Sequence, residues 1–196
     1  MRFAAAFLIA AGWMAHGQHV GFGVIGGVPF TDAFNAATGS TGLNNFVQYQ
    51  VDTGRYAIGP MIELRLPVVS VEADALFRPV SVKQQATATA AAQSTGAGWA
   101  EIPILLKVHV PAPIVKPFVG AGPTFRWFPG NASELTSVSR GGFSIGAGVN
   151  VHAVFLHIEP SLRYTHWGAG PFRASGGAVL LQANQNQFEF LVSISH

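Results

Sequence analysis

Most of the chain alternates between apolar and polar residues with a period of two. Between Gly98 and Val110, Ile102, Ile104 and Leu106 share one parity, whereas Glu101 and Lys107 occupy the other. Successive side chains of a β-strand point to opposite faces, so this alternation predicts strands with one apolar and one polar face. Eight such segments are predicted, at His19–Phe30, Arg55–Leu66, Val68–Val82, Gly98–Val110, Ile114–Phe128, Gly141–His152, Val154–Gly168 and Asn186–His196.

The connections between these segments are alternately long and short. The short ones are Leu66–Val68, Val110–Pro113 and His152–Val154, and the long ones are Thr31–Gly54, Lys83–Ala97, Pro129–Arg140 and Ala169–Gln185. This rhythm gathers the tight turns at one end and the long connections at the other. An even number of strands, each long enough to cross a bilayer, is typical of barrels of the outer-membrane type. The sequence therefore predicts an all-β fold, an eight-stranded antiparallel up-and-down transmembrane β-barrel.

Charged residues follow the parity of the strands. Of the 20 charged residues (11 Lys+Arg, 9 Asp+Glu), eleven fall on the polar face. They are predicted to form a charge network inside the barrel: Glu63, Arg65, Glu72, Asp74, Arg78, Glu101, Lys107, Arg126, Glu159, Arg163 and Glu189. None of the 20 charged residues lies in the middle of a strand on the apolar face, where Arg or Lys is costly in lipid.

Composition separates a membrane barrel from a soluble one with the same two faces. The 196 residues are 49% hydrophobic and 10% charged, with a mean hydropathy of +0.34. A soluble domain has about a quarter of its residues charged, and the few charges here are too scarce to solvate an outer surface. The apolar parity is therefore predicted to face lipid, with a soluble barrel such as a lipocalin as the alternative.

The first seventeen residues have the features of a signal peptide. Met1-Arg2 is followed by an apolar run from Phe3 to Met14 and by small residues at Ala15 and Gly17. A membrane-spanning helix needs about 20 apolar residues, more than this run provides. We therefore predict a cleaved signal peptide at residues 1–17, a barrel domain at residues 18–196 and a location in the bacterial cell outer membrane.

Three segments resemble strands of a known family. Glu101–Lys107 (EIPILLK), Pro117–Pro123 (PFVGAGP) and Glu159–Tyr164 (EPSLRY) are similar to recurrent strands of the outer-membrane β-barrel domain family, which groups OmpA-like and PorT-like eight-stranded barrels. The resemblance implies the same fold, and recognition of the C-terminal strand by the barrel-assembly machinery. Such barrels usually end on an aromatic residue, whereas this chain ends on His196.

Aromatic residues crowd the ends of the strands near the long connections. A lipid-facing girdle at the membrane interface is predicted there. Its expected members are Tyr56, Phe77, Trp99, Phe125, Trp127, Tyr164 and Trp167.

The sequence contains little that indicates catalysis or a cofactor. Gly21–Gly26 matches the G-x-G-x-x-G pattern but lacks the strand and helix that a dinucleotide site requires. Cysteine is absent, and the seven histidines form no established metal motif, so no cofactor and no metal are expected. The alternative is a transition metal at the short-turn rim, where His152 and His157 flank one tight turn and could be cross-strand neighbours. A net charge of +2 with no run of Lys or Arg argues against nucleic acid as a partner.

The expected function is that of a non-enzymatic barrel with a mostly closed interior. Its four long connections would face outside for structural or surface-interaction roles, and its partners would be outer-membrane lipids and lipopolysaccharide. The extracellular ligand is not defined by the sequence. Two alternatives are a narrow ion or small-solute pore, and a lipid-modifying enzyme based on His166, although Gly168 stands where a nucleophile would be needed.

Overall fold

The structure is a computed structural model that describes most of the chain beyond its first residues. The described residues are 19–31, 34–35, 37–40, 46–53, 56–85, 93–112, 114–127, 140–153, 156–168, 171–173 and 179–196. The predicted signal peptide at residues 1–17 lies outside them. None of the described residues belongs to a helix that is long and apolar enough to cross a membrane.

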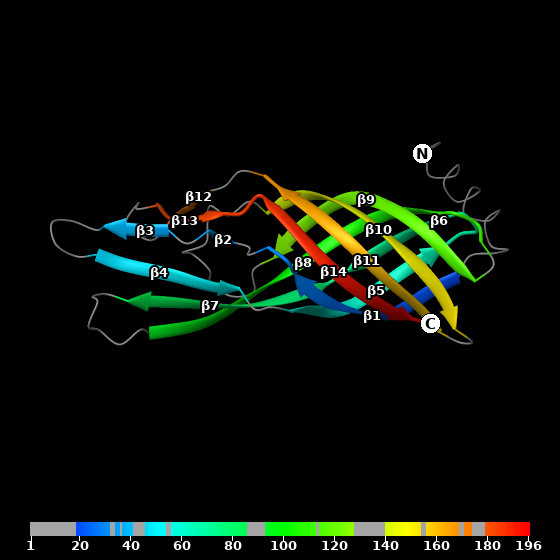
Figure 1. Ribbon diagram of the computed structural model, residues 1–196, viewed down its shortest axis with the longest axis horizontal. Coiled ribbons are helices and arrows are strands. Elements are labelled where there is room, and N and C mark those ends of the chain that lie inside the picture. The colour runs from blue at the N-terminus through cyan, green and yellow to red at the C-terminus, as the bar shows by residue number, and fades with distance from the viewer. Residues whose placement is uncertain are drawn as a thin grey trace, which may run out of the picture.

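A closed antiparallel barrel forms the body of the molecule (Figure 1). Each neighbouring pair is antiparallel, and β1 pairs with both β5 and β14, which closes the sheet. The predicted eight-stranded barrel is therefore confirmed, with β6 and β7 as two parts of one barrel strand. The barrel strands are β1 (His19–Pro29), β5 (Ala57–Arg65), β6 (Val69–Asp74), β7 (Leu76–Gln85), β8 (Gln93–His109), β9 (Val115–Trp127), β10 (Gly141–Ala153), β11 (Leu156–Trp167) and β14 (Asn186–Ser195).

The third predicted strand, Val68–Val82, is interrupted at Ala75. The register places Ala75 opposite Pro60, and the Ala75 N–H donates to the Pro60 carbonyl at 3.0 Å. Proline has no N–H with which to return the second bond of the pair. β6 and β7 keep one register against β5, and one register against β8, before and after Ala75. The interruption therefore moves no side chain to the other face.

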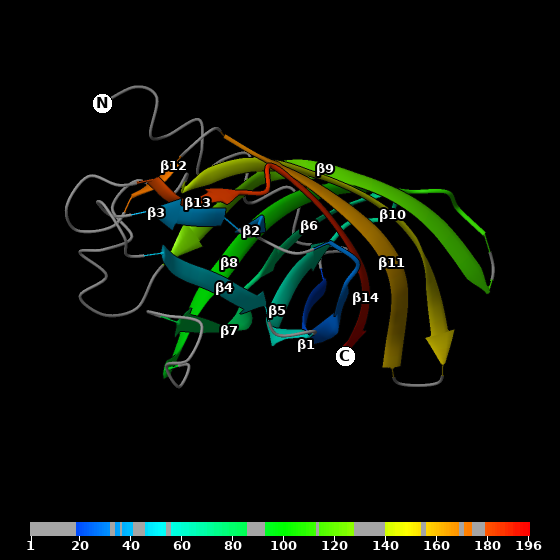
Figure 2. The same cartoon turned by 60° about the vertical axis from the view of Figure 1, so that its left-hand side comes forward.

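Two of the predicted long connections contain further strands. β3 (Ala37–Ser40) pairs with β4 (Phe46–Thr53), and β4 pairs with the outer part of β7. The β7–β8 ladder also continues as far as Gln84 and Gln93, beyond the strand ends that the sequence predicts. A separate three-stranded sheet contains β2 (Phe34–Asn35), β12 (Pro171–Arg173) and β13 (Val179–Ala183). These strands project from one end of the barrel (Figures 1 and 2).

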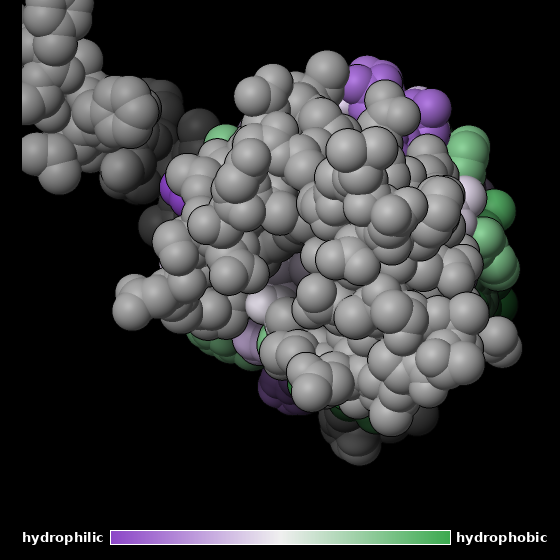
Figure 3. Space-filling view, turned by 90° about the vertical axis from the view of Figure 1, so that its left-hand side faces the viewer, coloured by the Kyte–Doolittle hydropathy of each residue, from purple (hydrophilic) through white to green (hydrophobic). Residues whose placement is uncertain are grey.

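The barrel is apolar outside and polar inside. Phe22, Leu106, Val119 and Leu162 are among the exposed apolar side chains, whereas the buried polar and charged residues outnumber the buried apolar ones in the described part of the chain. In a view from the end with the long connections, the described residues along the right-hand edge of the barrel are mostly apolar (Figure 3). This distribution is the inverse of that in a soluble domain, where large apolar surface patches are rare.

Candidate functional site

The interior of the barrel brings the predicted charged residues together. All eleven lie on the inner face; ten are almost fully buried, and the side chain of Arg65 is 17% exposed. Six carboxylates and five cations therefore share the interior, and water is largely excluded from all of them except Arg65. An unpaired charge in such a space is strongly unfavourable, so the position of each partner matters.

Lys107 lies at the centre of the first group of ion pairs. Its Nζ atom is 2.5 Å from a Glu159 oxygen and 3.2 Å from a Glu63 oxygen, and it also pairs with Glu72. The three carboxylates come from β5, β6 and β11, and their oxygens approach within 4.8 Å of one another. Such a cluster suits a cation, and the ammonium group of Lys107 supplies it.

Neighbouring residues hold this lysine in position. Nζ lies 4.6 Å from the centroid of the Phe118 ring, a cation–π distance. A Cβ atom at Gly120 would lie 3.0 Å from Cγ of Lys107, so the glycine leaves room for the lysine side chain. The Ser70 hydroxyl donates to Glu63 at 2.7 Å and adds a neutral partner to the cluster.

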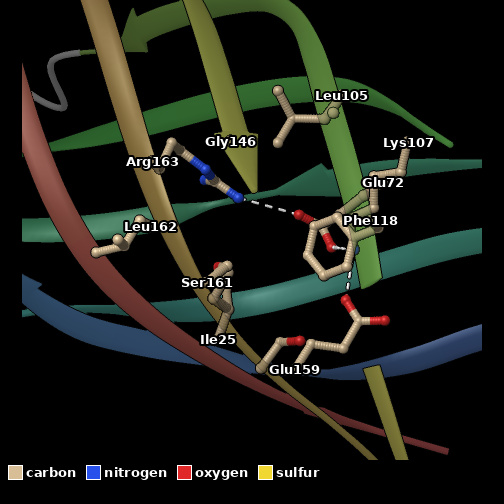
Figure 4. A pocket seen from close by; sticks show the side chains of 12 residues that line it. Ile25, Glu72, Leu105, Lys107, Phe118, Gly146, Glu159, Ser161, Leu162 and Arg163 are labelled. Atoms are coloured by element: carbon tan, nitrogen blue, oxygen red, sulfur yellow. Dashed lines mark hydrogen bonds and ion pairs between the residues drawn. The ribbon is translucent and has the colours of Figure 1, made fainter. Parts of the chain in front are cut away.

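Arg163 connects the group of ion pairs around Lys107 to the middle of the barrel (Figure 4). Its guanidinium is 3.0 Å from a Glu72 oxygen and 2.8 Å from an Asp74 oxygen. The space beside it, lined by Glu72, Lys107 and Glu159 among others, has a volume of only about 10 Å³. That is close to the minimum needed for a single water molecule, so these side chains fill this part of the barrel.

A second group of ion pairs lies nearer to the long connections. Glu101 accepts from Arg78 at 2.5 Å, from Arg126 at 3.1 Å and from the Trp99 indole at 3.0 Å. Arg78 also pairs with Glu189. The Arg126 guanidinium lies 3.6 Å from the Trp167 ring centroid, a cation–π contact at the edge of this group of ion pairs.

The predicted aromatic girdle needs correction at two positions. Tyr56, Phe77, Phe125 and Trp127 are exposed on the outer wall, and Tyr164 is partly exposed there and packs against Phe188 with ring centroids 4.7 Å apart. The prediction was wrong for Trp99 and Trp167, which are 3% and 1% exposed and point inward. Their strand parity is that of Glu101 and Thr165, and in a β-strand parity decides the face.

Trp167 fits against a glycine on the adjacent strand. A Cβ atom at Gly142 would come within 2.8 Å of the Trp167 ring and of the His166 carbonyl oxygen. We expect Gly142→Val to displace the indole, to break its 2.8 Å hydrogen bond to Gln187 and to cost about 1–3 kcal/mol of stability. Near-UV circular dichroism and urea unfolding measure both effects.

Gly141→Val is the matched control, because a Cβ atom at that position meets nothing within 4 Å. Equal losses in the two variants would mean that contact with the indole is not the cause.

Several uncharged polar residues also belong to the interior and were not singled out from the sequence. Thr124, Ser144 and Thr165 form a chain of hydroxyl groups across β9, β10 and β11, with oxygen separations of 2.5 and 2.7 Å. Asn150 donates to Glu159, and Ser70 contacts both Glu63 and His109. The signal that could have found them is their parity, which matches that of the charged residues.

At the short-turn end the interior opens into a vestibule of about 170 Å³. It is lined by His19, Glu63, Arg65, Leu66, Pro67, Ser70, His109, Lys116, Asn150 and His157. The Arg65 guanidinium donates to Glu63 at 2.7 Å and to Ser195. Polar groups from several strands therefore line this mouth of the barrel.

His166 lies on the outer wall near the long connections. Its Nδ1 atom is 2.9 Å from the Asn186 side-chain oxygen, which also accepts from the Tyr164 hydroxyl at 2.7 Å. Within the described residues, the side-chain hydrogen bond of His166 is to this amide rather than to a hydroxyl group. A base with an orienting partner is present, but the nucleophile that hydrolysis requires is not among its contacts.

Comparison with known proteins gives one family. A family model for the outer membrane protein beta-barrel domain matches residues 2–190. No curated protein matches the chain.

Proposed function

Because this chain belongs to the outer membrane protein β-barrel domain family, we propose that it is a scaffold barrel of the bacterial outer membrane with a charge-paired, closed interior. Its long-connection end would face the cell exterior and serve structural or surface-interaction roles. The short turns and the vestibule would then face the periplasm.

One observation carries the proposal of a closed interior. The cations and carboxylates extend across the lumen from Glu63 through Lys107 and Arg163, and the space beside them is only about 10 Å³. An eight-stranded barrel has an interior just wide enough for side chains. Ion pairs at this density favour a filled core over a conducting path.

The apolar outer wall supports the proposal that lipids are the immediate partners. An apolar groove of about 640 Å³ lies over β8 to β11 and β14, where Ala121 and Ala147 stand between larger side chains such as Leu106 and Ile145. Outward-facing apolar side chains in such numbers suit contact with acyl chains. The assembly machinery, recognising β14, is the other partner we propose.

The projecting strands support a role at the cell surface. β3 and β4 continue the barrel wall beyond the predicted strand ends, and β2, β12 and β13 form a second sheet beside them. Binding functions are commonly placed on connections that a rigid scaffold holds in position. Replacing Thr31–Gly54 by a short Gly/Ser turn should alter surface binding while heat-dependent gel mobility still reports a folded barrel.

The same barrel should not conduct ions. We expect no single-channel steps when the protein is inserted into planar bilayers, because the lumen is filled by paired side chains. A large porin inserted into the same bilayers is the positive control. Steps from the wild-type chain that change size in Arg163→Ala would contradict this proposal and favour the narrow-pore alternative.

The lipid-modifying alternative makes a different prediction. If His166 were a general base, lipid A would be deacylated by the wild-type protein and not by His166→Ala. We expect the two proteins to leave lipid A equally intact in detergent assays monitored by mass spectrometry. Turnover by the wild-type protein that His166→Ala abolishes would favour the enzyme.

A further inference from the structure

The β10–β11 hairpin places two histidines opposite each other at the short-turn mouth of the barrel. His152 and His157 are cross-strand partners, and their ring centroids are 4.5 Å apart. The nearest nitrogens, Nδ1 of His152 and Nε2 of His157, are separated by 3.2 Å. His152 is exposed to solvent, so a solute can reach the pair from outside the barrel.

Asn150 determines which nitrogen of His157 carries the proton. Its Nδ2 group donates to Glu159, and a carboxylate that pairs with an ammonium group can only accept. The orientation of the amide is therefore fixed, and its oxygen faces Nδ1 of His157 at 3.2 Å. Because a carbonyl oxygen accepts only, Nδ1 must be the protonated nitrogen, and Nε2, which lies 3.2 Å from Nδ1 of His152, is the nitrogen that carries a lone pair.

The 3.2 Å between these two nitrogens is close to the separation of two imidazole ligands on one metal ion. Ligands at 2.0–2.1 Å in a tetrahedral site are about 3.3 Å apart, close to the separation observed here. Metal-binding histidines also typically donate their second ring N–H to an oxygen in the surrounding shell, as His157 does to Asn150. We propose that His152 and His157 form a binding site for a late first-row divalent metal ion, with solvent completing the coordination.

The order of affinity among metals follows from the ligand type. Two imidazoles favour Cu²⁺ over Ni²⁺ and Zn²⁺. Arg65 and Lys116 line the adjoining vestibule, and their positive charge opposes a cation, although Arg65 is paired with Glu63. The site is separate from the carboxylates around Lys107, which already hold an ammonium group.

The test is a Cu²⁺ titration of the full chain, purified in detergent without a polyhistidine tag. Competition with a chelating dye gives the affinity, and electron paramagnetic resonance reports the number of nitrogen ligands. We expect coordination by two nitrogens in the wild-type protein, and affinities roughly tenfold or more weaker in His152→Gln and His157→Gln. Asn150→Ala should weaken binding about tenfold by releasing the His157 ring.

His109→Gln and His166→Gln are the matched controls. His109 lies in the same vestibule but contacts Ser70, and His166 lies at the opposite end of the barrel. Both should bind Cu²⁺ as the wild type does. Wild-type affinity in His152→Gln or His157→Gln, or absence of binding by the wild-type protein, would overturn the metal site.

If the protein does not bind metal, the proposed function as a scaffold barrel still stands. Heat-dependent gel mobility reports the folded barrel whether or not metal is bound, so a variant that folds and does not bind is informative. His152 is exposed, and its substitution is expected to leave that mobility unchanged.

Discussion

Replacing Lys107 with methionine is expected to lower the free energy of unfolding by about 3–5 kcal/mol. Methionine fills much of the same space but supplies no charge. Glu63, Glu72 and Glu159 would then face one another without their shared cation, in a part of the barrel that excludes water. Urea unfolding in lipid vesicles, monitored by tryptophan fluorescence, measures the loss.

Lys116→Met is the matched control, because Lys116 is exposed near the short-turn mouth. An exposed charge contributes little, so the control should stay within about 0.5 kcal/mol of the wild type. The double variant Lys107→Met with Glu159→Gln should recover part of the loss by removing one unpaired carboxylate. Equal stability of Lys107→Met and Lys116→Met would show that the buried ion pairs do not hold this part of the barrel together.

The barrel strands could be predicted from the sequence because period two is a direct consequence of strand geometry. The predicted segment Gly141–His152 corresponds to β10 (Gly141–Ala153), and Asn186–His196 corresponds to β14 (Asn186–Ser195). Lipid makes the alternation clear, since it admits few polar residues on the outer face.

Other features of the fold have no such periodic signal. The interruption at Ala75 depends on Pro60 in the neighbouring strand, which the local sequence around Ala75 does not contain. β4 forms because it finds a partner in the outer part of β7, a pairing between segments more than 25 residues apart. Trp99 and Trp167 were misplaced because the prediction followed their height along the strand and neglected their parity.

The interior site was also predictable only in part. Parity identifies which charges point inward, but the partners depend on strand register and on the curvature of the closed sheet. Lys107 and Glu159 are 52 residues apart, and Arg163 and Glu72 are 91 apart. Asn150 is uncharged, yet it fixes the orientation of His157, a role that appears only when the hydrogen bonds are known.

A charge introduced on the outer wall should also destabilise the barrel. Leu162 lies near the middle of β11 on the outer face and is 58% exposed. In lipid, Leu162→Arg places a cation near the bilayer midplane and should cost about 2–4 kcal/mol. On a soluble barrel the same change would exchange an exposed apolar residue for a solvated one and cost almost nothing.

Leu156→Arg separates the effect of depth from that of the side chain. Leu156 lies on the same strand and face but at its short-turn end, and is 44% exposed. A cation there reaches the interface, so the expected cost falls to about 0–1 kcal/mol. Urea unfolding of both variants in lipid vesicles measures this difference. A large loss of stability in Leu162→Arg with a small one in Leu156→Arg requires a hydrocarbon layer around β11. Equally small losses in the two variants would mean that the outer wall faces water.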